Sequence, residues 1–118
     1  MNTAAASIIP DDRRDALRQP SVLVEIIVEE DSGAVFSATI QDVSRTGIRF
    51  RSMHKFDMNT FVILHPPANI GLDACQVEIV RGYEVEENGH LYYDFGARYT
   101  ELSGRIRHAW FLSLRKSV

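Results

Sequence analysis

Residues 74–99 read ACQVEIVRGYEVEENGHLYYDFGARY and give the clearest indication of the fold. Two runs rich in apolar, β-branched and aromatic residues, 74–86 and 91–99, flank an Asn-Gly pair that strongly favours a tight β-turn. Because successive side chains of a strand point to opposite faces, one face of this hairpin is expected to enter the core. We expect that inward face to carry the alternating residues Cys75, Val77, Ile79, Tyr83 and Val85, opposite Leu91, Tyr93, Phe95, Ala97 and Tyr99.

The rest of the chain predicts four more strands and one helix. Residues 21–30 (SVLVEIIVEE) and 35–40 (VFSATI) flank an Asp-Ser-Gly turn and predict a second hairpin. Residues 48–51 and 61–64 predict two shorter strands, and residues 105–116 carry apolar residues at helical spacing. Six strands with short connections, followed by one helix, predict an all-β fold: a six-stranded antiparallel barrel capped by a C-terminal α-helix.

The composition is typical of a soluble protein with one domain. At 118 residues, with 45% hydrophobic and 25% charged residues, the chain is long enough to bury one core. No apolar run approaches the roughly 20 residues of a membrane span, so we expect no membrane insertion. We predict a flexible arm over residues 1–10, which lacks the features of a signal peptide, and one domain over residues 11–118. The single cysteine, Cys75, cannot form an internal disulfide, and we expect a cytoplasmic protein.

The charge of the chain favours a small anionic ligand over nucleic acid. The net charge is −3, whereas nonspecific nucleic-acid binding requires a basic surface. A barrel for single-stranded nucleic acid would also interleave aromatic residues with lysine and arginine, yet only two of the thirteen basic residues are lysine. Arginines nevertheless gather in two short segments of the chain: Arg13, Arg14, Arg18, Arg45, Arg49 and Arg51.

Two motifs lie at opposite ends of the hairpin predicted over residues 21–40. Residues 14–18 read RDALR, an R-x-x-x-R pattern, and residues 42–47 read DVSRTG, a D-x-S-x-x-G pattern. Two arginines offer two planar forks of hydrogen-bond donors. The second motif offers a carboxylate, a hydroxyl and a backbone without a Cβ atom. Together these groups suit a ligand that carries both phosphates and purine edges.

This arrangement resembles the PilZ family, small β-barrel domains that bind the bacterial second messenger cyclic di-GMP. The resemblance rests on the doubled Arg13-Arg14, on the two motifs and on residues 95–99 (FGARY), which are similar to the last strand of the family. It covers nearly the whole chain after the first ten residues and implies the same capped barrel. It also implies a cyclic di-GMP site formed by Arg14, Arg18, Asp42, Ser44 and Gly47, with Arg13, Arg45, Arg49 and Arg98 as auxiliary contacts.

The chemistry of the ligand suggests a role for each residue of that site. Arginine can bind phosphate oxygens or the O6/N7 edge of guanine bidentately. We therefore expect Arg14 and Arg18 to bind phosphates and guanine edges of the ligand. Asp42 would accept hydrogen bonds from guanine N1–H and N2–H₂ or orient an arginine. Ser44 would donate to a phosphate or a base, and Gly47 would allow close backbone approach. Without a ligand, the same residues would be a solvated arginine pair and a tight turn.

The sequence favours a binding protein over an enzyme. Its four histidines lack the paired spacing of a metal site, and neither a G-x-S-x-G motif nor a P-loop is present, so we expect no metal or cofactor. The leading hypothesis is a cyclic di-GMP receptor that relays the signal to an unidentified partner protein in motility, biofilm or exopolysaccharide control. The alternative is an adaptor that keeps the barrel but does not use the nucleotide, for example in type IV pilus assembly. Some members of the PilZ family are adaptors of this kind.

Overall fold

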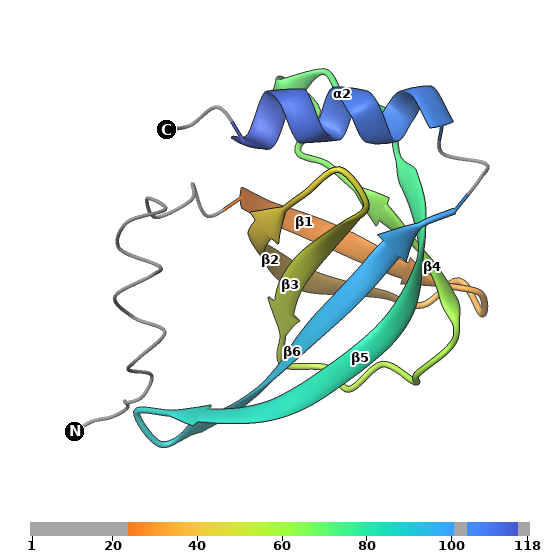
Figure 1. Cartoon of the computed structure of the whole chain (residues 1–118). Helices are drawn as coiled ribbons and strands as arrows, with labels where there is room; N and C mark the ends of the chain where they lie inside the picture. Colours follow the sequence, from red (N-terminus) through yellow and green to blue (C-terminus); the bar gives the residue numbers. More distant parts are fainter. Residues whose placement is uncertain (1–23, 101–103, 116–118) are drawn as a thin grey trace.

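The computed structural model describes residues 24–100 and 104–115 (Figure 1). The expected arm and the residues Arg13, Arg14 and Arg18 lie outside the described residues. Within the described ranges, the chain forms six strands, one 3₁₀ helix and one α-helix. Their order is β1 (Val24–Glu30), β2 (Val35–Val43), β3 (Gly47–Ser52), β4 (Phe61–His65), η1 (Ala68–Ile70), β5 (Cys75–Glu87), β6 (His90–Tyr99) and α2 (Gly104–Arg115).

The strands close into a barrel in the order β1-β2-β3-β6-β5-β4, which confirms the predicted fold class. Every neighbouring pair is antiparallel, and the pairing of β1 with β4 completes the circle. Closure leaves the central part of each strand with a partner on both sides, which satisfies its backbone hydrogen bonds. Within the described residues the predicted positions of the strands are correct, although β2 continues three residues beyond the expected end at residue 40 and enters the D-x-S-x-x-G motif.

The barrel interior and the inner face of α2 share one core. Helix α2 lies across one end of the barrel (Figure 1), where Trp110 is fully buried and its Nε1–H donates to the Asp73 carbonyl at 2.8 Å. Within residues 24–100 and 104–115, no helix has both the length and the apolar character that a membrane crossing requires. The core comprises the following buried residues: Val24, Ile26, Val28, Ala38, Ile40, Ile48, Phe50, Phe56, Val62, Leu64, Cys75, Val77, Ile79, Phe95, Ala97, Tyr99, Trp110 and Leu114.

The predicted inward face of β5 is correct up to Ile79 and wrong beyond it. A β-bulge shifts the register between Ile79 and Arg81, so that Ile79 pairs with Ala97 but Arg81 pairs with Gly96. Because side chains alternate with a period of two, this extra residue turns Tyr83 and Val85 outward. Tyr83 is accordingly 60% exposed.

One residue of the predicted inward face of β6 is also exposed. Leu91 lies on the expected face but is 46% exposed. The pairing of β6 with β3 ends where Tyr93 meets Ser52, and beyond that point the β5–β6 hairpin projects away from the barrel (Figure 1). Leu91 therefore lies past the end of the core, and the prediction that it is buried was wrong.

Candidate ligand-binding groove

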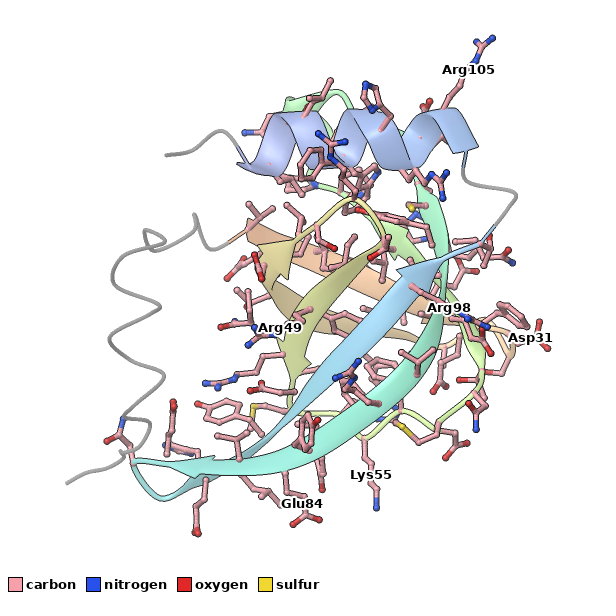
Figure 2. The ribbon with its side chains drawn as sticks, viewed as in Figure 1. Asp31, Arg49, Lys55, Glu84, Arg98 and Arg105 are labelled. Carbon is pink, nitrogen blue, oxygen red and sulfur yellow. The ribbon has the colours of Figure 1, made fainter. Side chains whose placement is uncertain are left out.

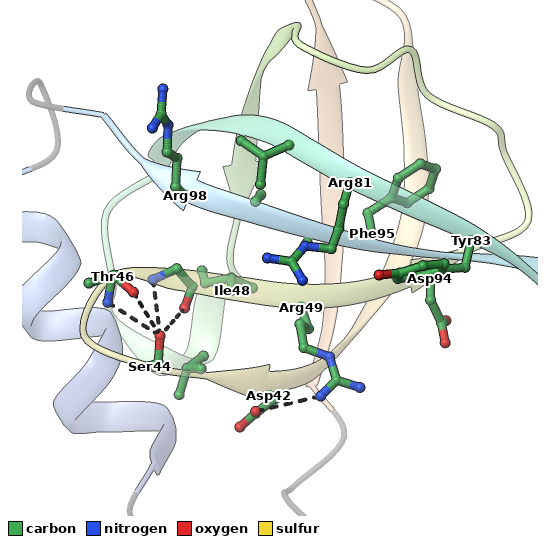
Figure 3. A pocket seen from close by; sticks show the side chains of 15 residues that line it. Asp42, Ser44, Thr46, Ile48, Arg49, Arg81, Tyr83, Asp94, Phe95 and Arg98 are labelled. Carbon is green, nitrogen blue, oxygen red and sulfur yellow. Dashed lines mark hydrogen bonds and ion pairs between the residues drawn. The ribbon is translucent and has the colours of Figure 1, made fainter. Parts of the chain in front are cut away.

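A groove with a volume of about 440 Å³ lies on the outer surface of the barrel, over β3, β6 and the middle of β5 (Figure 3). Its lining includes all three predicted residues of the D-x-S-x-x-G motif, Asp42, Ser44 and Gly47, together with the auxiliary candidates Arg49 and Arg98. These residues come from three different strands and one turn. The structure thus brings together five of the nine predicted site residues on one surface.

A β-bulge in β2 determines the direction of Asp42. Ile40 pairs with the buried Phe50, and the register then shifts so that Asp42, rather than Gln41, lies opposite Arg49. Without the extra residue, strict alternation from Ile40 would turn Asp42 into the core. Asp42 instead faces the groove, where its Oδ2 lies 3.9 Å from Arg49 Nη1. The carboxylate is therefore placed to orient an arginine, which is one of its two predicted roles.

The turn between β2 and β3 is organised by Ser44. Its backbone N–H donates to the Gly47 carbonyl at 2.9 Å. Its Oγ accepts hydrogen bonds from the backbone N–H groups of Gly47, at 3.1 Å, and Thr46, at 3.3 Å. The hydroxyl lies 3.3 Å from the Gly47 carbonyl, to which it can donate. These contacts use the one donor and both acceptor positions of a hydroxyl, so donation to a ligand would require the hydroxyl to rotate.

Gly47 is required by the packing of the barrel itself. A Cβ atom at this position would lie 2.3 Å from the carbonyl oxygen of Ala97 on β6, well inside van der Waals contact. The neighbouring Thr46 carbonyl accepts the backbone N–H of Tyr99 at 3.1 Å, which attaches the turn to the end of β6. Gly47 was predicted to allow a close approach of the backbone to the ligand. In the structure its missing Cβ already allows the backbones of β3 and β6 to approach each other closely.

Two auxiliary candidates have partners inside the domain. The Arg45 guanidinium lies 5.5 Å from the ring centroid of Phe111, a cation–π contact that joins the turn to α2, and Arg45 does not line the groove. Arg98 faces outward as predicted, at the edge of the groove. Its Nε and Nη2 bind Glu78 Oε1 at 2.9 Å and 2.8 Å, while its side chain stays 67% exposed.

The β5 side of the groove is formed by Arg81 and Tyr83, neither of which was predicted as a site residue. Both residues face outward only because of the bulge that follows Ile79. The sequence did contain a signal for that bulge. Ile79 and Val80 are adjacent apolar residues that break the alternation, and a glycine, Gly82, follows within the strand.

Comparison with known proteins identifies the family. The family model described as "PilZ domain" matches residues 12–110, which contain both motifs. The chain belongs to the PilZ family. PilZ domains are binding and regulatory domains, and the family binds cyclic di-GMP. No curated protein matches the chain in sequence.

The fold of this PilZ domain is similar to two structures of MrkH from K. pneumonia. The apo-state structure superposes with a TM-score of 0.62 and 13% identity over 80% of this chain and 47% of MrkH. The 2.65 Å P2(1) crystal structure gives a TM-score of 0.62 and 14% identity over 81% and 46% of the two chains. The chain therefore spans slightly less than half the length of MrkH, and the likeness is one of fold.

One arginine of the sequence cluster has a structural role in the PilZ barrel. Arg51 binds Asp94 through Nε at 2.6 Å and Nη2 at 3.0 Å, and its Nη1 binds Glu87 at 3.0 Å. The hydrogen bonds to Asp94 are the main cause that raises the pKa of Arg51 above its ordinary value, against the opposing effect of burial. Arg51 is thereby committed to joining β3, β6 and β5. In the described ranges, no three His, Cys, Asp or Glu side chains gather as metal ligands.

Proposed function

We propose that this PilZ domain is a receptor for cyclic di-GMP, which binds in the outer groove beside the turn between β2 and β3. One observation carries the proposal. The bulge in β2 and the Ser44-centred turn present the predicted motif at one end of a groove that three exposed arginines line, Arg49, Arg81 and Arg98. Arginines bind phosphate and guanine edges bidentately, and the Asp42 carboxylate can accept from guanine N1–H and N2–H₂.

The length of the chain allows Arg14 and Arg18 to reach this groove. Val24, the first residue of β1, pairs with Ile40, two residues before Asp42, so β1 begins at the motif end of the barrel. Arg18 precedes Val24 by six residues. A segment of that length spans at most roughly 20 Å. The arginines of the R-x-x-x-R motif can therefore close over a ligand held beside Asp42, which would couple ligand binding to the position of this segment.

The output of such a receptor would be a change in its contacts with a partner protein. The contact of Arg45 with Phe111 links the ligand-binding turn to α2 and offers a route from the groove to the helix surface. We propose a bacterial cytoplasmic receptor that acts in motility, biofilm or exopolysaccharide control. The partner would be recognised through a surface that responds to the bound nucleotide.

Calorimetric titration with cyclic di-GMP tests the proposal. The wild-type protein should bind saturably, and the Arg14→Ala/Arg18→Ala variant should bind at least a hundredfold more weakly, since each charged hydrogen-bonding group contributes about 1.5–3 kcal/mol. The matched control is Lys55→Ala/Arg105→Ala, which removes two cations that lie away from the groove (Figure 2). This control should bind as the wild type does.

Two outcomes would contradict the receptor function. If the folded wild-type protein does not bind cyclic di-GMP, the nucleotide-independent adaptor becomes the better hypothesis. If the control variant loses as much affinity as the motif variant, binding depends on overall charge rather than on the site. A steep loss of affinity with added salt would also indicate that binding depends on overall charge, because such a loss is typical of a protein that binds a polyanion.

A further inference from the structure

We infer that Arg81 is a phosphate-binding residue of the groove and that it acts together with Arg49. The inference rests on the proposed function, because it concerns the same ligand, and it adds a residue that neither motif contains. Arg81 lies on β5, on the opposite side of the groove from the D-x-S-x-x-G turn. The ligand would therefore be held from two sides of the groove, by Arg81 on β5 and by the D-x-S-x-x-G turn.

The strand register places Arg81, Gly96 and Arg49 in one row across the outer surface. Arg81 pairs with Gly96 on one side of β6, and Gly96 pairs with Arg49 on the other. Neighbouring strands are about 4.8 Å apart, so the backbones of the two arginines are separated by roughly 10 Å. Directly paired residues point to the same face, so both side chains extend outward into the groove.

Gly96 leaves the path that Arg81 occupies. A Cβ atom at position 96 would lie 3.1 Å from Cγ of Arg81 and 3.5 Å from its Cδ, so the arginine stem lies directly over the glycine. Figure 3 shows the Arg81 side chain crossing from β5 toward β3, while Arg49 extends from β3 toward Asp42. The two guanidinium groups thus lie in succession along the groove, near the turn that carries the motif.

The charges of this row are incompletely matched. In the part of the chain that the structure describes, Arg98 and Arg51 each have a carboxylate partner within 3.0 Å, whereas Arg81 forms no ion pair. Arg49 reaches Asp42 only at 3.9 Å. An anion held between Arg81 and Arg49 would gain attraction from both cations. A neutral guanine edge would leave the two positive charges unbalanced, so the row favours a phosphate.

The test is a titration of cyclic di-GMP into four proteins: wild type, Arg81→Ala, Arg81→Lys and the control Arg105→Ala. Arg81→Ala should weaken binding roughly tenfold to a hundredfold, as expected for loss of a charged hydrogen-bonding group. Arg81→Lys should recover most of the affinity, because lysine supplies the positive charge that attracts a phosphate. The recovery should be incomplete, because lysine lacks the planar fork of arginine. Arg105→Ala, an exposed arginine of α2, should bind as the wild type does.

The outcomes separate this inference from the receptor function. If Arg81→Ala binds as tightly as wild type while Arg14→Ala/Arg18→Ala loses binding, the receptor function stands and the role of Arg81 is wrong. If Arg81→Lys binds as weakly as Arg81→Ala, a positive charge at this position does not hold the ligand, and the assignment to phosphate from the unmatched charges is wrong. If the folded wild type does not bind at all, both proposals fail. Thermal melting of each variant verifies that it is folded.

Discussion

Two walls of one barrel differ in regularity more than in composition. We call β3, β6, the middle of β5 and the end of β2 (residues 41–43) the groove wall, and β1, β4 and the first part of β2 (residues 35–40) the opposite wall. In the opposite wall, Val24, Ile26 and Val28 alternate strictly with outward residues, and β1 pairs with both neighbours without a register shift. Its carboxylates lie close to histidines, with 2.7 Å between Glu29 and His65.

The groove wall is interrupted at both of its sides. Bulges lie at Gln41 in β2 and after Ile79 in β5, and glycines replace side chains at positions 47 and 96. A bulge bends and twists a strand, while a glycine has no side chain to cover the surface between its neighbours. The comparison indicates that the groove arises from these irregularities, because both walls otherwise have the same alternation of apolar and polar residues.

The largest expected difference between the walls is in the stability lost when one glycine of each wall is replaced by alanine. Gly47→Ala should lower the free energy of unfolding by roughly 3 kcal/mol, because its Cβ would overlap the Ala97 carbonyl oxygen, a backbone atom that cannot turn aside. Gly33→Ala, in the β1–β2 turn, should cost only about 1–2 kcal/mol, because its φ of +95° is unfavourable but the space around it is open. Urea denaturation measures both values.

Equal costs at the two glycines would contradict the close packing of the groove wall. A smaller cost for Gly47→Ala than for Gly33→Ala would mean that β3 and β6 can separate without penalty. Titration of cyclic di-GMP into the folded fraction of Gly47→Ala adds a second measurement. Binding should be lost in this variant, since the turn that carries Ser44 would move with Gly47.

A smaller effect, on binding rather than stability, should distinguish the acidic residues of the two walls. Asp42→Ala should weaken cyclic di-GMP binding about tenfold through loss of a charged hydrogen-bonding group. It should change the free energy of unfolding by less than about 1 kcal/mol, because its ion pair with Arg49 is exposed. Glu29→Ala, in the opposite wall, should leave binding unchanged. Calorimetry and thermal melting of both variants check this, and unaltered binding of Asp42→Ala would remove Asp42 from the site.

The regular parts of the fold were predictable from local patterns. In β1 the inward residues follow a period of two along the chain, and the Asn88-Gly89 pair forms the tight turn between β5 and β6. Trp110 is buried as an apolar helix residue should be. These features depend on residues that are close in sequence, which is why the pattern alone was sufficient.

The irregular parts were not predictable in the same way. A bulge adds one residue, and with a period of two that residue reverses every later assignment in the strand, as it did for Tyr83 and Val85. Arg81 was missed for the same reason. The motif containing Asp42 and Gly47 was found by family resemblance, but the packing role of Gly47 depends on Ala97, fifty residues away in the sequence. The ligand-binding roles of the motif residues stay predictions.

The smallest effect is expected on the inner side of the groove wall, at Tyr99. Its hydroxyl is buried and has no hydrogen-bond partner among the described residues, and burial raises the pKa of Tyr99 above its ordinary value. An unfolded tyrosine loses its proton near pH 10 while the folded one retains it, so the wild type should lose about 1.4 kcal/mol of stability per pH unit above 10. Tyr99→Phe should abolish this loss, gain up to about 1 kcal/mol at pH 7 and leave cyclic di-GMP binding unchanged. Urea denaturation at pH 7 and pH 11 measures the difference, and an equal alkaline decline in both proteins would show that Tyr99 ionises freely in the folded state.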